Sequence, residues 1–343
     1  GMVSSLEDDF YRLKVRKISH IKKAVWKYEV PASNGLINFT PITENKHLLD
    51  ACLNFINSEA TNDKKDCKSL PLEKSNTNDE SHDESNFNGA QMFCLDDSVK
   101  DQMLSVKGKS PIAFMGKTVD SRQKNLFIKL NEDYSENILL LGENGQEQVT
   151  RTTMNLFVSL MMSARLKHKD ISFKVIDCLS NEEGEAHELI YDLEDEGFCE
   201  IVERRKRSKF FKELAQGIQD GTVEETILLI LGQDRFRELK MDMEMEESND
   251  GKSLNIRTYR EALNVILDKG PDYGVHTLLQ LEKVSNLLFE DHITPKVVFQ
   301  KFKHLVMLKS DEAINVALHL NDDIHLENLN CSKERLTAFY YAE

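Results

Sequence analysis

The sequence lacks long apolar runs, paired cysteines and an excess of positive charge. Its longest apolar runs, such as Ile227–Leu231, are far too short to cross a bilayer, and no signal-peptide pattern opens the chain. The six cysteines include no C-x-x-C pair and no regular spacing, which argues against a zinc site and against a disulfide framework. The net charge of −15 disfavours a broad nucleic-acid surface. We therefore expect a cytoplasmic protein with no membrane span and no bound metal.

Three segments of different composition divide the 343 residues. Residues 1–57 are mixed and small for an independent domain, which predicts an N-terminal connector, and Gly1 before Met2 is typical of a tag-cleavage scar. Residues 58–88 are acidic, polar and of low complexity. They cannot bury enough surface to offset chain entropy, which predicts a linker. Residues 89–343 contain enough apolar side chains for a large core.

The first segment is locally basic, with Tyr11 and Trp26 among its cations. Such a stretch can follow a nucleic-acid backbone or dock on an acidic neighbour. Docking is favoured because the rest of the chain is acidic. The cations are Lys14, Arg16, Lys17, Lys22, Lys23 and Lys27.

Strand and helix patterns alternate along the third segment. Near-continuous apolar strands separated by helices predict an α/β fold with a mostly parallel central sheet and helices on both faces. The acidic stretch Met241–Asp250 lacks an apolar stripe and predicts a solvated loop. The expected strands are 137–141, 172–177, 198–202, 226–231, 275–281, 304–308 and 335–341, and the expected helices are 147–167, 185–193, 207–219, 255–269, 295–301 and 311–319.

A glycine-bearing loop follows the first of these strands, where a phosphate-binding loop would lie. It reads G-E-N-G-Q-E-Q-V from Gly142 to Val149. A working loop reads G-x-x-x-x-G-K-[ST], because backbone N–H groups surround the phosphates, the lysine reaches their outer oxygens and the hydroxyl holds magnesium. The last three positions are here Glu147, Gln148 and Val149. The frame indicates a nucleotide-handling fold, whereas the residues argue against nucleotide hydrolysis.

Two other interpretations of this loop stay open. A motif that starts at Gly145 places Arg151 and Thr152 at the lysine and hydroxyl positions, which would partly restore the chemistry. It also moves the loop along the chain and puts Thr150 where glycine is required. Alternatively, Gly142 and Gly145 only permit a tight turn between a strand and a helix.

Further landmarks follow the loop in a fixed order. They are F-K-V-I-D at 173–177, T-I-L-L-I-L-G-Q-D at 226–234, D-K-G-P-D-Y-G-V-H-T-L-L-Q at 268–280, F-K-H-L-V-M-L-K-S-D-E-A at 302–313 and E-R-L-T-A-F-Y-Y at 334–341. Together with N-I-L-L-L-G-E-N-G-Q-E-Q-V-T-R from residue 137, this order resembles the FtsK/SpoIIIE family of hexameric DNA-pumping motor domains, a branch of the RecA-like P-loop fold. The glycine-proline turn that leads into Gly274-Val275-His276 is its most characteristic part. The match covers roughly 250 residues, from about Asn86 to Glu343. The resemblance to long tandem members of the family implies that the segment 1–57 is the tail of a preceding module.

The resemblance implies a hexameric ring, ATP binding and DNA as the substrate of the full assembly. The chain departs from the family pattern where the chemistry is done. The acidic pair that holds magnesium and activates water falls on Gly232 and Gln233, and Asp234 lies one or two residues too late. Other departures are Glu282 and Lys283 at the polar pair of the sensor strand, and Leu305 at a late arginine.

We therefore expect a module that keeps the fold of the motor without its chemistry. It has no catalytic residue and no cofactor, or at most weak binding of ATP with magnesium. The degenerate phosphate loop consists of Gly142, Gly145, Glu147, Gln148, Val149 and Thr150, and the degenerate acidic motif of Gly232 and Gln233.

The leading hypothesis is the C-terminal module of a larger ATP-driven DNA-translocase-type motor, serving assembly, regulation or substrate recognition. Its partners are other modules of the parent chain or like subunits in a ring, with DNA reached through the full assembly. Two alternatives stay open. One is an active ATP-binding DNA translocase domain with a non-standard loop. The other is a degenerate secretion-motor module that binds a protein signal segment.

Other motifs have simpler interpretations. The basic run Arg204–Arg207 predicts a solvated helix start, with phosphate contact as the alternative. His187 opens an H-E-x-x-H pattern, but Tyr191 stands where the second histidine is needed, so no zinc site is expected. His276 is expected to be a hydrogen-bonded structural residue.

Overall fold

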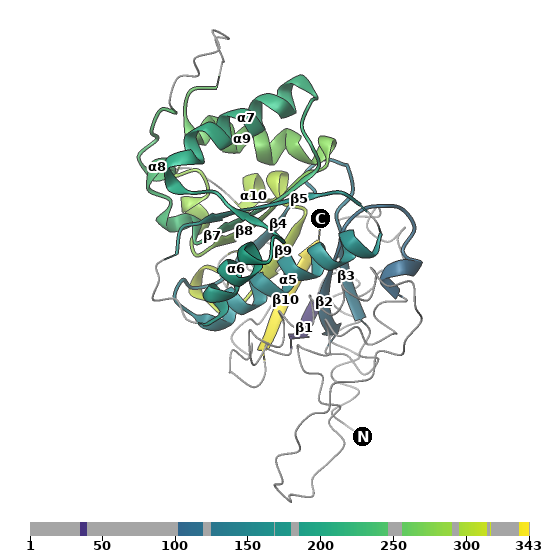
Figure 1. The fold of residues 1–343 in the computed structure, drawn as a ribbon. Coiled ribbons are helices and arrows are strands. Elements are labelled where there is room, and N and C mark those ends of the chain that lie inside the picture. The colour runs from purple at the N-terminus through teal and green to yellow at the C-terminus, as the bar shows by residue number, and fades with distance from the viewer. Residues whose placement is uncertain are drawn as a thin grey trace, which may run out of the picture.

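The fold is known from a computed structural model, which describes residues 35–39, 102–118, 125–167, 169–179, 185–245, 256–289, 295–313, 316 and 336–342. Its strands join into one sheet in the order β3-β2-β1-β10-β9-β4-β8-β7-β5-β6 (Figure 1). The strands are β1 Gly35–Phe39, β2 Ile112–Thr118, β3 Asn125–Lys129, β4 Ile138–Leu141, β5 Ser172–Asp177, β6 Glu200–Ile201, β7 Thr226–Leu231, β8 Val275–Leu281, β9 His304–Met307 and β10 Leu336–Ala342. The helices are α5 Glu147–Leu166, α6 Glu185–Asp195, α7 Arg207–Asp220, α8 Arg237–Lys240, α9 Tyr259–Lys269 and α10 Pro295–Lys301.

The strands from β9 to β6 run parallel to one another. β4, β7 and β8 are buried at every position, which explains their continuous apolar sequences. β8 lies between β4 and β7, so the strand before the glycine loop is not the neighbour of the strand before Gly232. This order is that of a RecA-like P-loop domain, and it confirms the predicted fold class.

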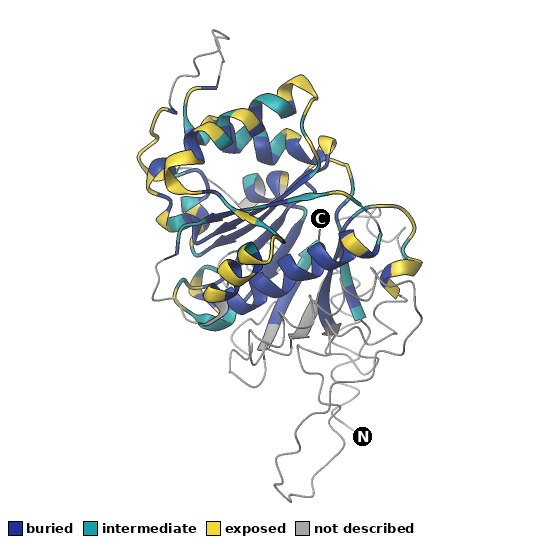
Figure 2. Ribbon diagram, in the orientation of Figure 1, coloured by how far each residue is buried: buried dark blue, intermediate teal, exposed yellow. Residues whose placement is uncertain are grey.

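Helices cover both faces of the parallel strands, with α5 and α6 on one face and α7, α9 and α10 on the other (Figure 1). Each face carries its own apolar cluster. α5 is buried along nearly its whole length, because the sheet, α6 and β2 all contact it (Figure 2). On the opposite face, the rings of Phe211, Phe236 and Tyr259 pack pairwise with centroids 5.5–5.7 Å apart. Both layers together hold the strand ends rigidly.

Antiparallel strands extend the sheet beyond β9. Only β10 was expected among them. β2 and β3 form a hairpin in a stretch for which no strand was predicted, and β1 comes from the segment 1–57 that was expected to be a connector. Part of that segment therefore pairs within the same sheet as the rest of the fold. The predicted boundaries around the linker 58–88 lie outside the described residues, so they stay predictions.

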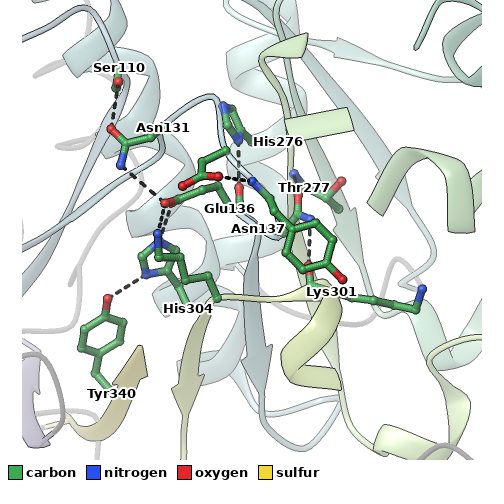
Figure 3. A network of polar contacts seen from close by, with 12 residues as sticks. Ser110, Asn131, Glu136, Asn137, His276, Thr277, Lys301, His304 and Tyr340 are labelled. Carbon is green, nitrogen blue, oxygen red and sulfur yellow. Dashed lines mark hydrogen bonds and ion pairs between the residues drawn. The ribbon is translucent and has the colours of Figure 1, made fainter. Parts of the chain in front are cut away.

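A buried polar network joins the N-terminal ends of β4, β8 and β9 (Figure 3). The Glu136 carboxylate accepts a hydrogen bond from His304 Nε2 at 2.9 Å and pairs with the Lys303 ammonium, while His304 Nδ1 lies 2.8 Å from the Tyr340 hydroxyl on β10. Burial raises the pKa of Glu136, but His304 and Lys303 outweigh it and bring the pKa to about 2. His276 Nδ1 lies 2.8 Å from the Glu136 carbonyl oxygen, and burial lowers the pKa of His276 to about 4. His276 is thus a structural residue, as expected.

Differences from the predicted elements occur mainly at their ends. The expected helix 255–269 begins only at Tyr259, because Thr258 and Glu261 form a reciprocal capping box there. The expected strand 198–202 is reduced to Glu200–Ile201. Met241–Met245 forms a turn with an isolated bridge between Glu244 and Thr258, in agreement with the predicted loop. The first basic residues, from Lys14 to Lys27, and most of the expected helix 311–319 lie outside the described residues.

Candidate functional site

The glycine loop lies at the C-terminal edge of the parallel sheet, between β4 and α5. The Gly142 N–H donates to the Leu281 carbonyl oxygen of the neighbouring strand β8 at 3.1 Å, which ties the start of the loop to the sheet. Gly145 has a φ of 84°, in the left-handed region that favours glycine. The helix then begins at Glu147. Strand, turn and helix follow one another as in a phosphate-binding loop.

Val149 stands where the magnesium-holding hydroxyl of such a loop would be, and it is fully buried. Its side chain covers Gly142, because a Cβ atom at Gly142 would lie 2.7 Å from Val149 Cγ2. Glu147, at the place of the second glycine, forms an ion pair with Arg151 one helical turn later. Gln148 stands at the lysine position. The loop therefore brings no positive charge and no hydroxyl toward a phosphate.

The alternative motif that starts at Gly145 is disfavoured by the same helix. Arg151 Nε donates to the Glu147 carboxylate at 2.9 Å, and Thr152 Oγ1 donates to the Gln148 carbonyl oxygen at 2.7 Å. Thr152 is fully buried. Because both side chains are bonded within α5, they do not form a lysine and hydroxyl pair in the loop.

The strand β7 ends in a tight turn at Gly232. Its φ is 61°, and a Cβ atom there would lie 2.3 Å from Leu179 Cδ2, so only glycine fits. The next residue, Gln233, is fully buried, and its Nε2 donates to the Asn286 carbonyl oxygen at 2.6 Å. Its amide nitrogen thus anchors the loop after β8, while its Oε1 has no hydrogen-bond partner among the described residues.

Asp234, which lies one or two residues after the expected place of the acidic pair, contacts the glycine loop through Asn144. The turn before it brings its carboxylate between this loop and the segment after β8, where it accepts four hydrogen bonds. The donors are Glu282 N at 2.6 Å, Lys283 N at 3.1 Å, Asn286 Nδ2 at 2.8 Å and Asn144 Nδ2 at 3.2 Å. Each carboxylate oxygen receives two of these bonds. The group is therefore engaged by its own chain and positions two loops.

Glu282 completes this arrangement from the end of β8. Its Oε2 accepts a hydrogen bond from the Asn144 N–H at 3.3 Å. In a working phosphate loop, backbone N–H groups of this kind face the phosphate oxygens. An internal carboxylate thus occupies a position suited to an external anion. We call Asp234, Glu282 and Asn144 the carboxylate clamp.

Sequence reasoning missed one more polar contact, between β8 and α5. Thr153 Oγ1 lies 3.1 Å from Gln280 Oε1 and 2.9 Å from the Val149 carbonyl oxygen. Gln280 is fully buried, and its Nε2 has no hydrogen-bond partner within the described part of the chain. Turning the amide over would let Nε2 donate to Thr153 Oγ1, but Oε1 would then take the position that has no partner. A glutamine near the end of an apolar strand was the available signal in the sequence.

His187 and Tyr191, the first and last residues of the incomplete H-E-x-x-H pattern, both contact Asp177 at the end of β5. Asp177 Oδ2 lies 2.8 Å from His187 Nε2 and accepts a hydrogen bond from the Tyr191 hydroxyl at 2.9 Å. Burial raises the pKa of Asp177, but the bond and charge of His187 outweigh it, so the pKa lies below its usual value. Burial and Asp177 raise the pKa of Tyr191 to about 12. Both α6 residues hold the helix on β5. Among the described residues, no group of three histidine, cysteine or acidic side chains could hold a metal ion.

The basic run before α7 is paired within the fold. Arg204 Nε donates to Glu238 at 2.7 Å, and Arg205 and Lys206 both pair with Glu203. Arg207 is buried under Phe236 and donates to the Asp177 carbonyl oxygen. Arg204, Arg205 and Lys206 are exposed, in agreement with the prediction of a solvated helix start, whereas Arg207 is buried, contrary to it.

Three solved structures are similar to this chain at low sequence identity. Thermomonospora curvata EccC (ATPases 2 and 3), in complex with a signal sequence peptide, matches with 14% identity and a TM-score of 0.44, over 68% of this chain and 43% of that one. The monomer form of the pCW3 conjugation coupling protein TcpA with ATPγS matches with 14% identity and a TM-score of 0.41, over 63% and 59%. EssC (ATPases 2 and 3) from Geobacillus thermodenitrificans matches with 14% identity and a TM-score of 0.42, over 69% and 45%.

This chain resembles the FtsK/SpoIIIE-type ATPases. Its RecA-like fold rests on the strand order of the sheet. The chain matches about half the length of these structures, from 43% to 59%. No family model matches the chain, and no curated protein matches it in sequence. No helix among the described residues is long and apolar enough to cross a membrane.

Proposed function

We propose that this chain is a non-hydrolysing FtsK/SpoIIIE-like module that serves assembly, regulation or substrate recognition within a larger ATP-driven motor. The carboxylate clamp carries this proposal. Asp234 and Glu282 together bond to the main-chain and side-chain donors of Asn144, and Asp234 also bonds to the amides that follow β8. Carboxylates of the chain itself thereby occupy hydrogen-bond donors of the glycine loop.

The charges around the loop oppose a nucleotide. Two unit charges about 4 Å apart interact by about 4 kcal/mol at an effective dielectric constant of 20. A phosphate at the Asn144 N–H would meet this repulsion from Glu282 and would also have to displace its hydrogen bond. The missing lysine removes charge-assisted bonds worth about 1.5–3 kcal/mol each. Both effects favour an empty site.

The chemistry of hydrolysis lacks its parts as well. Magnesium coordination needs oxygen ligands, and the buried Val149 has none to offer. The carboxylate of Asp234, in the turn after β7, already accepts four hydrogen bonds. Activation of an attacking water needs a free acceptor in line with the phosphate. In this proposal, active modules or subunits elsewhere in the assembly hydrolyse ATP and handle the DNA.

Titration of the purified chain with a fluorescent ATP analogue and magnesium, followed by a phosphate-release assay, tests the proposal. We expect no saturable binding at micromolar nucleotide and no release above a protein-free blank. Micromolar affinity with measurable phosphate release would refute the proposal and support the active translocase.

A restored loop provides the matched control. The triple variant Glu147→Gly, Gln148→Lys and Val149→Thr rebuilds G-x-x-x-x-G-K-T on the same backbone. We expect it to gain nucleotide binding, and to bind more tightly when Glu282→Gln is added, because the competing charge is then removed. If the restored loop with Glu282→Gln binds no nucleotide while circular dichroism shows a folded protein, the loop is not a disabled phosphate site.

A further inference from the structure

The strand β1 occupies an unusual place in the sheet. It lies between β10 and β2, at the join between the parallel core and the β2–β3 hairpin (Figure 1). Five residues of β1 pair antiparallel with β10, in a register that runs from Gly35 opposite Tyr340 to Phe39 opposite Leu336. Its pairing with β2 is limited to Ile37 opposite Thr118 and Asn38 opposite Lys117. β10 therefore holds β1 through most of its backbone contacts.

We call the space between β10 and β2 that β1 fills the slot. On its β2 side, β2 is anchored by contacts that do not involve β1. The Leu130 N–H, which follows β3, donates to the Pro111 carbonyl oxygen at 3.0 Å, so Pro111 faces β3. Because successive residues of a strand direct their backbone groups to opposite sides, the amides of Ile112 and Phe114 point away from β3, to the side of β2 on which β1 lies. These amides donate to serines of α5 instead, Ile112 N to Ser163 Oγ at 2.8 Å and Phe114 N to Ser159 Oγ at 2.5 Å. α5 thus fixes β2 along the stretch that β1 does not reach.

The β10 side is held independently as well. Four residues of β10 pair antiparallel with β9. The Tyr340 hydroxyl lies 2.8 Å from His304 Nδ1, which links β10 to the buried Glu136 network (Figure 3). Phe339 and Ala338 are buried in the two apolar clusters. Both walls of the slot thus keep their own anchors when β1 is taken away.

The connection of β1 to the fold is long. Residues 40–111 separate it from β2, and they include the polar stretch 58–88. The entropic cost of closing a loop grows only slowly with its length. Identical chains offer identical slots, and a connection of this length is long enough in sequence for β1 to reach the slot of a neighbouring copy when two copies lie side by side.

From this arrangement we infer that β1 is an exchangeable strand, and that the slot between β10 and β2 binds β1 of a second copy of this chain. Recognition is by antiparallel backbone pairing, as in other cases of strand addition. The inference goes beyond the proposed function and does not depend on whether the module binds nucleotide. It identifies a surface through which copies associate.

Photo-crosslinking of the full chain tests the exchange without disturbing its cysteines. A photoreactive amino acid replaces Leu36 in an isotopically light chain, which is mixed with an unmodified heavy chain, equilibrated at rising concentration and irradiated. We expect light peptides that contain 35–39 bonded to heavy peptides that contain 336–342, in a share that rises with concentration toward an upper limit of about one half for equal amounts of the two chains. Crosslinks that join only light to light at every concentration overturn the inference.

Two controls isolate the strand. The same reagent at Tyr134, which is 54% exposed and distant in sequence from β1, reports random encounters. The variant Ile37→Pro in the light chain removes an amide in the centre of a strand that has neighbours on both sides. It should lose the light-to-heavy product at least five-fold, while circular dichroism shows an unchanged core. An unchanged yield with proline means that β1 does not enter the slot as a strand.

Discussion

The carboxylate clamp predicts a large stability loss for the variant Asp234→Ala. The substitution removes the acceptor of four hydrogen bonds, two of them from the backbone amides of Glu282 and Lys283. A bond to a charged acceptor contributes about 1.5–3 kcal/mol. Because Asp234 is half-buried, water replaces part of what is lost, and bonds to one group are not additive. We expect the free energy of unfolding to fall by about 2–4 kcal/mol.

Equilibrium unfolding in urea, followed by far-ultraviolet circular dichroism, measures this loss. The only tryptophan, Trp26, lies outside the described residues, so its fluorescence would not report on the clamp. Asp272→Ala is the matched control, because Asp272 is exposed and also lies in a short 3-10 turn next to a strand of the core. Asp234→Asn should give an intermediate loss, since its amide nitrogen faces donors while one oxygen still accepts.

The outcome separates two roles for Asp234. A difference from the Asp272→Ala control below about 0.5 kcal/mol would show that the clamp contributes nothing to stability, and the carboxylate would then be free to serve a ligand. A large loss with an unchanged dependence on urea concentration supports the structural role, because the surface exposed on unfolding is then the same.

Two further predictions concern the ends of the strands. Gly232→Ala should destabilise the fold by at least about 1 kcal/mol more than Gly197→Ala, as measured by thermal unfolding. Both glycines have a positive φ, but only a Cβ atom at position 232 would contact Leu179. Equal losses for the two variants would refute the close contact. Glu136, whose pKa is lowered to about 2, should contribute stability that is fully present above the ordinary carboxyl pKa near 4.5 and is lost as the pH falls through about 2. Denaturation at several pH values should show that the difference in free energy of unfolding between the unmodified protein and Glu136→Gln shrinks across that window. A difference that does not depend on pH would contradict the prediction.

The parallel core was predictable because its strands are buried on both faces. Such strands have continuous apolar sequences, and β4, β7 and β8 were found at almost the expected residues. The β2–β3 hairpin was not predicted, although β2 is as long as β8, and part of its inner edge bonds to serines of α5 instead of to a strand. β1 was also missed, because its five residues lie in a segment of mixed composition and form a strand by pairing with β10 and β2, which are distant in the sequence.

The candidate site shows the same division. Residue identity at fixed spacing was enough to show which chemical groups are missing: the lysine and hydroxyl of the loop, and a carboxylate directly after β7. The groups that replace them became visible in the folded chain. The left-handed turn at Gly232 brings Asp234 to Asn144, and the end of β8 brings Glu282 to the same loop. Contacts between residues far apart in the chain depend on strand order, which no local pattern specifies.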